Sequence, residues 1–79
     1  MNLMNSFRSY LLDEEFKITI IENKIDVVNY DSIGHFDSSK VMIHYKNKTL
    51  VIKGKNLVVS RLLSDEVLVT GEIKGIEIQ

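Results

Sequence analysis

The 79-residue chain contains no cysteine and no proline, and it has only four glycines. Without cysteine it can form neither a disulfide nor a thiolate metal site, so a reducing compartment is compatible with the sequence. Without proline, nothing in the chain interrupts the hydrogen-bonded ladders of interior strands. The chain also lacks an apolar run near the roughly 18 residues of a membrane-spanning helix, and its start does not read as a signal peptide. We therefore expect a cytoplasmic protein with no transmembrane segment of its own.

An excess of charge of one sign is also missing, because ten basic residues oppose eleven acidic ones. A formal charge of −1 is too small to steer the whole protein onto nucleic acid. Residues 38–64 are a local exception, since they contain no acidic residue and carry six cations. Their lysines could bind phosphates or an anionic surface, but lysines at turns and strand edges more often prevent aggregation. Binding of nucleic acid or an anionic surface is therefore the alternative function, through Lys46, Lys48, Lys53 and Lys55.

From Phe16 onward, short segments rich in β-branched residues are separated by turn residues. The alternation predicts strands at 16–20, 25–30, 41–45, 49–53, 57–62, 67–73 and 75–78, with a bulge at Gly71. Since no crossover helix separates these segments, the pattern predicts an all-β fold, an antiparallel β-sandwich of about seven short strands. A β-solenoid-like stack is the alternative, because apolar triplets recur, although with no fixed period.

Several predicted strands are apolar at every position, for example Leu57-Val58-Val59 and Val67-Leu68-Val69. A sheet with one face in water would not tolerate such strands. Their second face must be covered by an opposing sheet, by a helix or by a second copy of the protein. We expect a sandwich with a contact between copies, and therefore a homo-oligomer.

Residues 1–15 have a different pattern from the β domain of residues 16–79. Helical spacings of three and four predict a short N-terminal amphipathic helix or tail. The apolar face of this helix could dock a partner, although such a face more often covers the protein's own sheet. The residues of this possible interaction face are Leu3, Phe7, Tyr10 and Leu11.

No set of residues predicts a metal, cofactor or catalytic site. His35 and His44 are the only histidines, whereas a zinc site needs three or four convergent ligands. His35 is expected in a turn, and His44 on the solvent side of a strand. A serine–histidine–acid set can be written from His35, Asp37 and Ser38 or Ser39, but sequence neighbours do not usually converge on a pocket. We therefore predict that the protein is not an enzyme.

Several segments between Phe16 and Ile78 resemble the YabP/YqfC family of sporulation proteins of endospore-forming bacteria. The most distinctive is the pattern L-x-I-x-G-x-N-L over residues 50–57, where Gly54-Lys55-Asn56 predicts a tight turn between two strands. Asn29 stands where members of the family often have glycine, and asparagine also tolerates a left-handed backbone. The other matching segments are residues 18–21 and 25–28, Phe36-Asp37, residues 66–69 and residues 71–76.

The resemblance implies a small β-rich protein that is made during spore formation and acts without catalysis beside a membrane partner of the mother cell or forespore. It implies no active-site residues. We therefore predict a sporulation-associated protein that acts by self-association and protein–protein interaction, in the mother-cell cytoplasm or peripherally at the forespore membrane.

Overall fold

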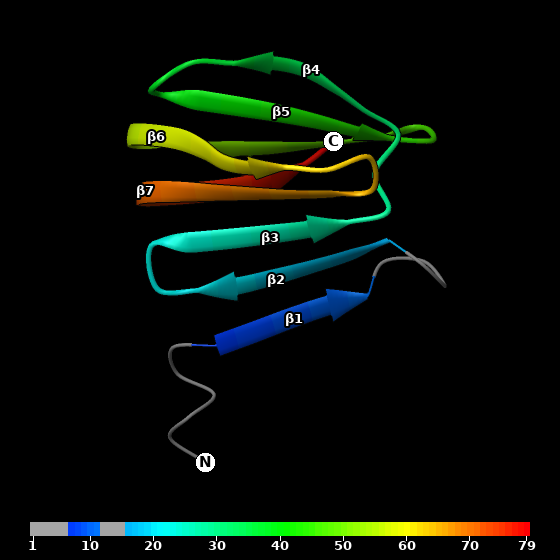
Figure 1. Ribbon diagram of the computed structural model, residues 1–79, viewed down its shortest axis with the longest axis horizontal. Helices are drawn as coiled ribbons and strands as arrows, with labels where there is room; N and C mark the ends of the chain where they lie inside the picture. Colours follow the sequence, from blue (N-terminus) through cyan, green and yellow to red (C-terminus); the bar gives the residue numbers. More distant parts are fainter. Residues whose placement is uncertain (1–6, 12–15) are drawn as a thin grey trace.

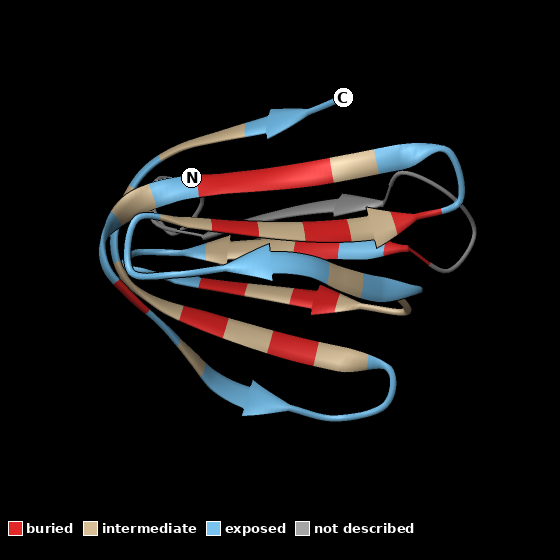
Figure 2. Ribbon diagram, turned by 90° about the horizontal axis from the view of Figure 1, so that it is seen from above, coloured by how far each residue is buried: buried red, intermediate tan, exposed pale blue. Residues whose placement is uncertain are grey.

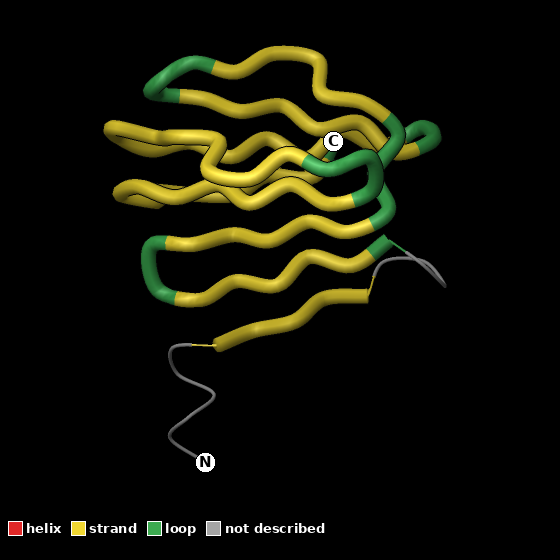
Figure 3. The backbone as a smooth tube through the Cα atoms, in the orientation of Figure 1, coloured by secondary structure: helices red, strands yellow, loops and turns green. Residues whose placement is uncertain are grey.

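The computed structural model describes residues 7–11 and 16–79, and the described residues contain strands and no helix (Figure 3). All strand pairs are antiparallel, and the strands form one sheet in the order β1-β2-β3-β7-β6-β5-β4 (Figure 1). The prediction of an all-β antiparallel fold is confirmed. The strands are β1 (Phe7–Leu11), β2 (Lys17–Ile21), β3 (Lys24–Val28), β4 (Ser32–Phe36), β5 (Lys40–Tyr45), β6 (Lys48–Leu62) and β7 (Glu66–Ile78).

The two longest strands fold this single sheet over on itself. β6 pairs with β5 only through residues 48–53, and β7 pairs with β3 only through residues 66–70. Between these regions both strands curve from one side of the molecule to the other (Figure 2). One layer therefore contains β1, β2 and β3, together with residues 58–62 of β6 and 66–70 of β7. The other layer contains β4 and β5, together with residues 48–53 of β6 and 75–78 of β7.

The predicted turn at Gly54-Lys55-Asn56 is wrong, because these residues lie inside the continuous strand β6. Two pairs of predicted strands, 49–53 with 57–62 and 67–73 with 75–78, are single bent strands. The bends coincide with register shifts of the β6–β7 ladder, where extra residues bend a strand without ending it. Gly71 lies at one of these shifts, so the predicted bulge is confirmed.

The predicted N-terminal helix is also wrong where the chain is described, because residues 7–11 form the edge strand β1. Successive positions of a strand alternate between its two faces, whereas a helix brings residues three and four apart onto one face. Phe7, Tyr10 and Leu11 therefore do not form the predicted helix face. A helix this short is marginal in water, whereas β1 pairs with β2 along five residues. Leu3 lies outside the described residues.

The core lies between the two layers. Phe16, at the entry to β2, stacks on Tyr45, at the end of β5, with ring centroids 4.4 Å apart. This pair joins the layers, and around it pack ten further buried side chains: Ile18, Ile25, Val27, Val41, Ile43, Leu50, Ile52, Leu57, Val67 and Val69.

Asparagines make several of the sharp changes of direction. Asn23 in the β2–β3 turn and Asn29 after β3 have φ angles of 62° and 66°, in the left-handed region that asparagine tolerates. The expectation for Asn29 is confirmed. Its backbone N–H donates to the carbonyl of Asp65, which ties the end of β3 to the β6–β7 loop.

The strands that are apolar at every position are covered unequally. Leu50, Val51 and Ile52 are all buried, so both faces of β6 are covered here within one chain. Val58, in contrast, is 56% exposed and lies on the outer side of the folded sheet. Within one chain the second half of β6 is therefore left uncovered, and cover of this part by a second copy stays a prediction.

Candidate interaction surface

Besides the outer edges of the terminal strands β1 and β4, parts of two interior strands are unpaired on one side in the described part of the chain. Residues 58–62 of β6 and residues 72–78 of β7 pair only with each other's strand, on one side. The two segments lie at opposite margins of the molecule in Figure 2. Such an edge presents N–H and C=O groups that another extended chain can pair with.

Exposed apolar side chains gather next to the β6 edge. Val58, Leu62 and Leu63 are 56%, 58% and 50% exposed, and Phe36 at the end of β4 is 61% exposed. The N–H of Leu57, at the bend of β6, donates to the carbonyl of Ser38 and joins this bend to the β4–β5 loop. Three large apolar side chains are therefore exposed in the second half of β6 and just after it, and a fourth at the end of β4.

The β7 edge borders an apolar groove between the layers. Ile18 and Ile20 of β2 and Ile76 and Ile78 of β7 line this groove, whose cavity volume is about 270 Å³. Only Ile78 among them is highly exposed, at 49%. Outside the groove, Lys74 pairs with Glu72, and Glu77 pairs with Lys53 of β6. The β7 edge therefore carries two ion pairs, whereas residues 58–62 of β6 carry one, between Arg61 and Glu66 at 4.0 Å.

The structure separates the four lysines of the alternative function into two pairs. Lys46 and Lys48 belong to the β5–β6 hairpin end, and Lys53 and Lys55 lie about 16 Å further along β6 at the bend. The Lys46 ammonium lies 5.2 Å from the Tyr45 ring centroid. Lys53 forms an ion pair with Glu77. Lys55 comes opposite Glu72 in the ladder. Binding of an anionic surface by these lysines stays a prediction.

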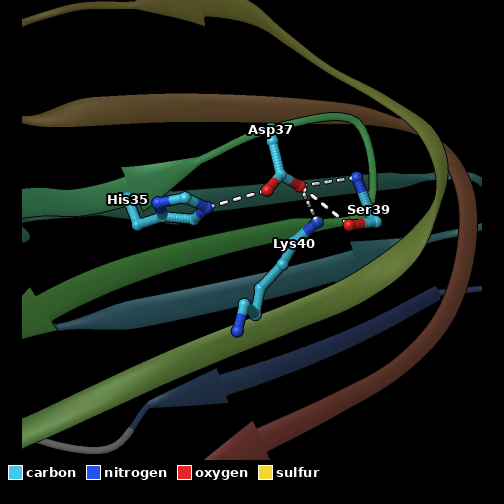
Figure 4. A network of polar contacts seen from close by, with 4 residues as sticks. All are labelled: His35, Asp37, Ser39 and Lys40. Carbon is cyan, nitrogen blue, oxygen red and sulfur yellow. Dashed lines mark hydrogen bonds and ion pairs between the residues drawn. The ribbon is translucent and has the colours of Figure 1, made fainter.

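His35, Asp37 and Ser39 converge, although such close neighbours in a sequence do not usually do so (Figure 4). His35 belongs to β4 rather than to a turn, and its Nε2 donates to Asp37 Oδ2 at 2.8 Å. The hydroxyl of Ser39 donates to Asp37 Oδ1 at 2.9 Å, as do the backbone N–H groups of Ser39 and Lys40 at 2.8 Å each. The His35 hydrogen bond, followed by those of Ser39, holds the pKa of Asp37 well below its usual range.

This cluster closes the turn between β4 and β5 and does not activate a nucleophile. The Ser39 hydroxyl donates to the carboxylate rather than to the imidazole, so His35 is not placed to accept its proton. The cluster is exposed on the surface. Within residues 7–11 and 16–79, no three histidine or acidic side chains are grouped to hold a metal ion.

His44 is half-buried on the outer side of β5 rather than fully open to solvent. Its Nδ1 and the hydroxyl of Thr49 on β6 are hydrogen-bonded at 3.0 Å. The ring also packs over Gly34, because a Cβ at that glycine would lie 2.1 Å from His44 Nε2. This histidine therefore joins three strands.

Asp26 of β3 and Glu66 of β7 form a carboxyl pair on the outer face of the sheet. Partial burial, then the hydrogen bond and the charge of Glu66, raise the pKa of Asp26 to about 6, against the opposing effect of Arg61 and Lys17. Arg61 Nη1 lies 4.0 Å from Glu66 Oε1. Asp26 therefore holds a proton, beside Glu66, under mildly acidic conditions.

We expect Asp26→Asn to stabilise the protein at pH 8 and to have little effect at pH 4. The folded-state pKa lies above the unfolded value of 3.8, so the stabilisation from protonated Asp26 is complete below 3.8 and is lost as the pH rises through 6. Thermal unfolding at pH 4, 6 and 8 measures this, with Asp65→Asn in the exposed β6–β7 loop as the charge-matched control. A gain of equal size at every pH would contradict the assignment.

A comparison with protein families identifies the chain. The model of the YabP family matches residues 13–79, which include β2 to β7 and the whole core. No curated protein and no solved structure matches the chain. The described residues include no helix long and apolar enough to cross a bilayer. Since the family model covers most of the sequence, the chain belongs to the YabP family, a membership that is consistent with a role in spore formation.

Proposed function

We propose that this protein acts in spore formation without catalysis, by associating with a second copy of itself and with a partner protein through its unpaired strand edges. The observation that carries the proposal is the second half of β6. There an unpaired edge coincides with Val58 and Leu62, each more than half exposed.

An unpaired strand edge of this kind tends to associate with another chain. Proteins usually blunt their sheet edges with charges, prolines or covering segments, because an unpaired edge templates pairing with another chain. Main-chain hydrogen bonds to an added strand supply affinity, and alternate side chains supply specificity. Arg61 is the only charged residue among residues 58–62. This edge therefore favours pairing more than the β7 edge does.

Two further considerations support the non-catalytic and sporulation parts of the proposal. In the cluster of His35, Asp37 and Ser39, the Ser39 hydroxyl donates a hydrogen bond to the Asp37 carboxylate, in an arrangement that closes a turn. Membership of the YabP family supports a role in spore formation. The resemblance also suggests where the protein acts, in the mother-cell cytoplasm beside a membrane protein of the forespore boundary.

The experiment uses an endospore-forming bacterium whose own copy of the gene is replaced by tagged variants. We expect two differently tagged wild-type copies to co-purify from sporulating cells and to restore the yield of heat-resistant spores. Val58→Lys combined with Leu62→Lys should abolish both results. Ile78→Lys, at a similarly exposed position of the β7 edge, is the control for self-association, which it should leave intact. Normal spore yield with the double variant, at wild-type protein level, would contradict the proposal.

A further inference from the structure

We propose that two copies of this chain pair antiparallel along the free edge of β6, about a twofold axis that passes between Ser60 and Arg61. The inference rests on the self-association in the proposed function and adds the surface and the register. It follows from the faces on which successive residues of β6 lie.

A bulge places two consecutive residues of β6 on the outer face. In the β6–β7 ladder Val59 lies opposite Val69, and Arg61 lies opposite Leu68, so Ser60 is the extra residue. Ser60 points outward, because its hydroxyl is hydrogen-bonded to that of Thr70 at 2.6 Å. Arg61 also points outward, next to Glu66 on the outer face.

The residues on either side of the bulge belong to the inner face. Val59 packs against the core from its position opposite the buried Val69. Leu62 lies opposite the buried Val67 and therefore shares its face. The order along β6 is thus Val59 inward, Ser60 and Arg61 outward, Leu62 inward.

This order determines which register a second copy can adopt. Directly opposite residues in an antiparallel pair share a face, so an inward residue must meet an inward one. Around the bulge, a twofold pairing meets this condition when the two bulges oppose each other. Val59 then lies opposite Leu62 of the second copy, and Ser60 lies opposite Arg61 of the second copy.

The resulting neighbours are compatible in charge and polarity. Val59 of one copy pairs with Leu62 of the other, and Val58 pairs with Leu63. Both pairs are apolar, and the twofold axis forms each of them twice. Ser60 opposite Arg61 keeps the two arginines from facing each other directly. The pairing would bury Val58, Leu62 and Leu63, which are among the most exposed large apolar residues of the described chain.

The same reasoning excludes a twofold pairing along the β7 edge. Lys74 is the extra residue there, since Gly75 lies opposite Lys53 and Ile73 lies opposite Gly54. Matching the faces places Ile73 opposite Ile76 of a second copy, but it also places Glu72 opposite Glu77 twice. Directly opposed like charges destabilise a strand pair. Of these two edges, only that of β6 is therefore self-complementary.

The position of β6 also leaves room for a second copy. Figure 2 shows the exposed end of β6 at the lower margin of the molecule, with β7 on its inner side. A strand added outside β6 would extend the sheet away from the core. A twofold contact of this kind closes after two copies, so we expect a dimer and not a filament.

Light scattering after size exclusion tests the dimer on the purified full chain. We expect the wild type at twice the chain mass of 9.1 kDa, and Leu62→Lys to raise the dissociation constant by about tenfold or more. Ile78→Lys is the matched control at the β7 edge and should leave the dimer intact. Circular dichroism of both variants checks that they are folded.

Cysteine cross-linking tests the register, because the chain has no cysteine of its own. Directly opposite strand residues have Cα atoms about 4.5–5.5 Å apart, within the range that a disulfide spans. The chain carrying Val58→Cys and Leu63→Cys should therefore oxidise to a covalent dimer. Its two cysteines, one in β6 and one just after its end, are about 16 Å apart and cannot join to each other. The chain carrying Ile73→Cys and Ile76→Cys should stay uncross-linked between copies.

The outcomes separate the failure of this inference from failure of the proposed function. A wild-type dimer that survives Leu62→Lys, or that cross-links through the β7 pair instead, would overturn the β6 register and leave self-association intact. A wild type that stays monomeric at all accessible concentrations would overturn both the register and self-association. A polymer that grows with concentration would show a non-closing contact and would also overturn the twofold pairing.

Discussion

Gly71→Ala is expected to destabilise the protein by about 3 kcal/mol or more, whereas Gly75→Ala in the same strand should change stability by less than about 0.5 kcal/mol. Gly71 has a φ of +133°, a conformation that residues with a side chain rarely adopt. A Cβ there would lie 2.6 Å from the backbone oxygen of Asn56 and 3.0 Å from the Cα of Leu57. The substitution therefore combines backbone strain with a clash against the backbone of β6.

The position of Gly71 makes this cost hard to relieve. It lies where β6 and β7 bend from one layer to the other, and its N–H donates to the carbonyl of Asn23 at 3.2 Å. Movement of β6 to admit a methyl group would disturb the packing of Leu57, which is buried. A methyl group added at Gly75, in contrast, would meet no atom within 4 Å.

Urea unfolding followed by circular dichroism measures both variants. We expect a much lower midpoint for Gly71→Ala at an unchanged slope, and nearly the wild-type curve for Gly75→Ala. Equal behaviour of the two variants would show that the bend does not depend on the close approach of β6 and β7.

Phe16→Ala is expected to cost about 3–5 kcal/mol, which is a large part of the stability of a domain this small. Phe16 is 1% exposed and stacks on Tyr45 with the ring planes 3° apart. Because these two residues come from different layers, removal of the Phe16 ring leaves a cavity where the layers meet. The surrounding strands are held by their ladders and can close that cavity only in part.

Phe36→Ala is the matched control for this prediction. Phe36 is 61% exposed at the end of the edge strand β4, so its truncation should cost less than about 0.5 kcal/mol. Thermal and urea unfolding of the two variants give the comparison. Similar losses in both would mean that burial between the layers is not what stabilises the fold.

Several features of the fold could be predicted from local sequence. The alternation of Val41, Ile43 and Tyr45 predicts the buried face of β5, and all three side chains are buried. The turn at Asn23 and the left-handed backbone at Asn29 follow from the chemistry of asparagine. Such features depend on neighbouring residues, so the sequence carries them directly.

The bends of β6 and β7 could not be predicted in the same way. Gly54-Lys55-Asn56 has the composition of a tight turn, and Asn56 does have a positive φ of 56°. The chain nevertheless continues as one strand, because β7 follows it around the bend and keeps pairing on both sides of the register shifts. A local signal for a change of direction does not show whether the ladder ends or only bends.

The candidate interaction surface was only partly accessible from sequence. Apolar residues on both faces of residues 57–59 indicated that something must cover Val58, and this side chain is indeed exposed in the single chain. The unpaired edge, however, depends on where β5 stops pairing with β6. The outward bulge at Ser60 depends on the ladder with β7, which no local pattern reveals.

Residue types and their short-range order were enough to establish the all-β class, the asparagine turns, the absence of cysteine chemistry and the likeness to the YabP family. The three-dimensional arrangement was needed to show that residues 7–11 form a strand, that four predicted strands merge into two, and which edges stay unpaired. These outcomes depend on hydrogen bonds between segments far apart in the chain, whose partners local patterns do not specify.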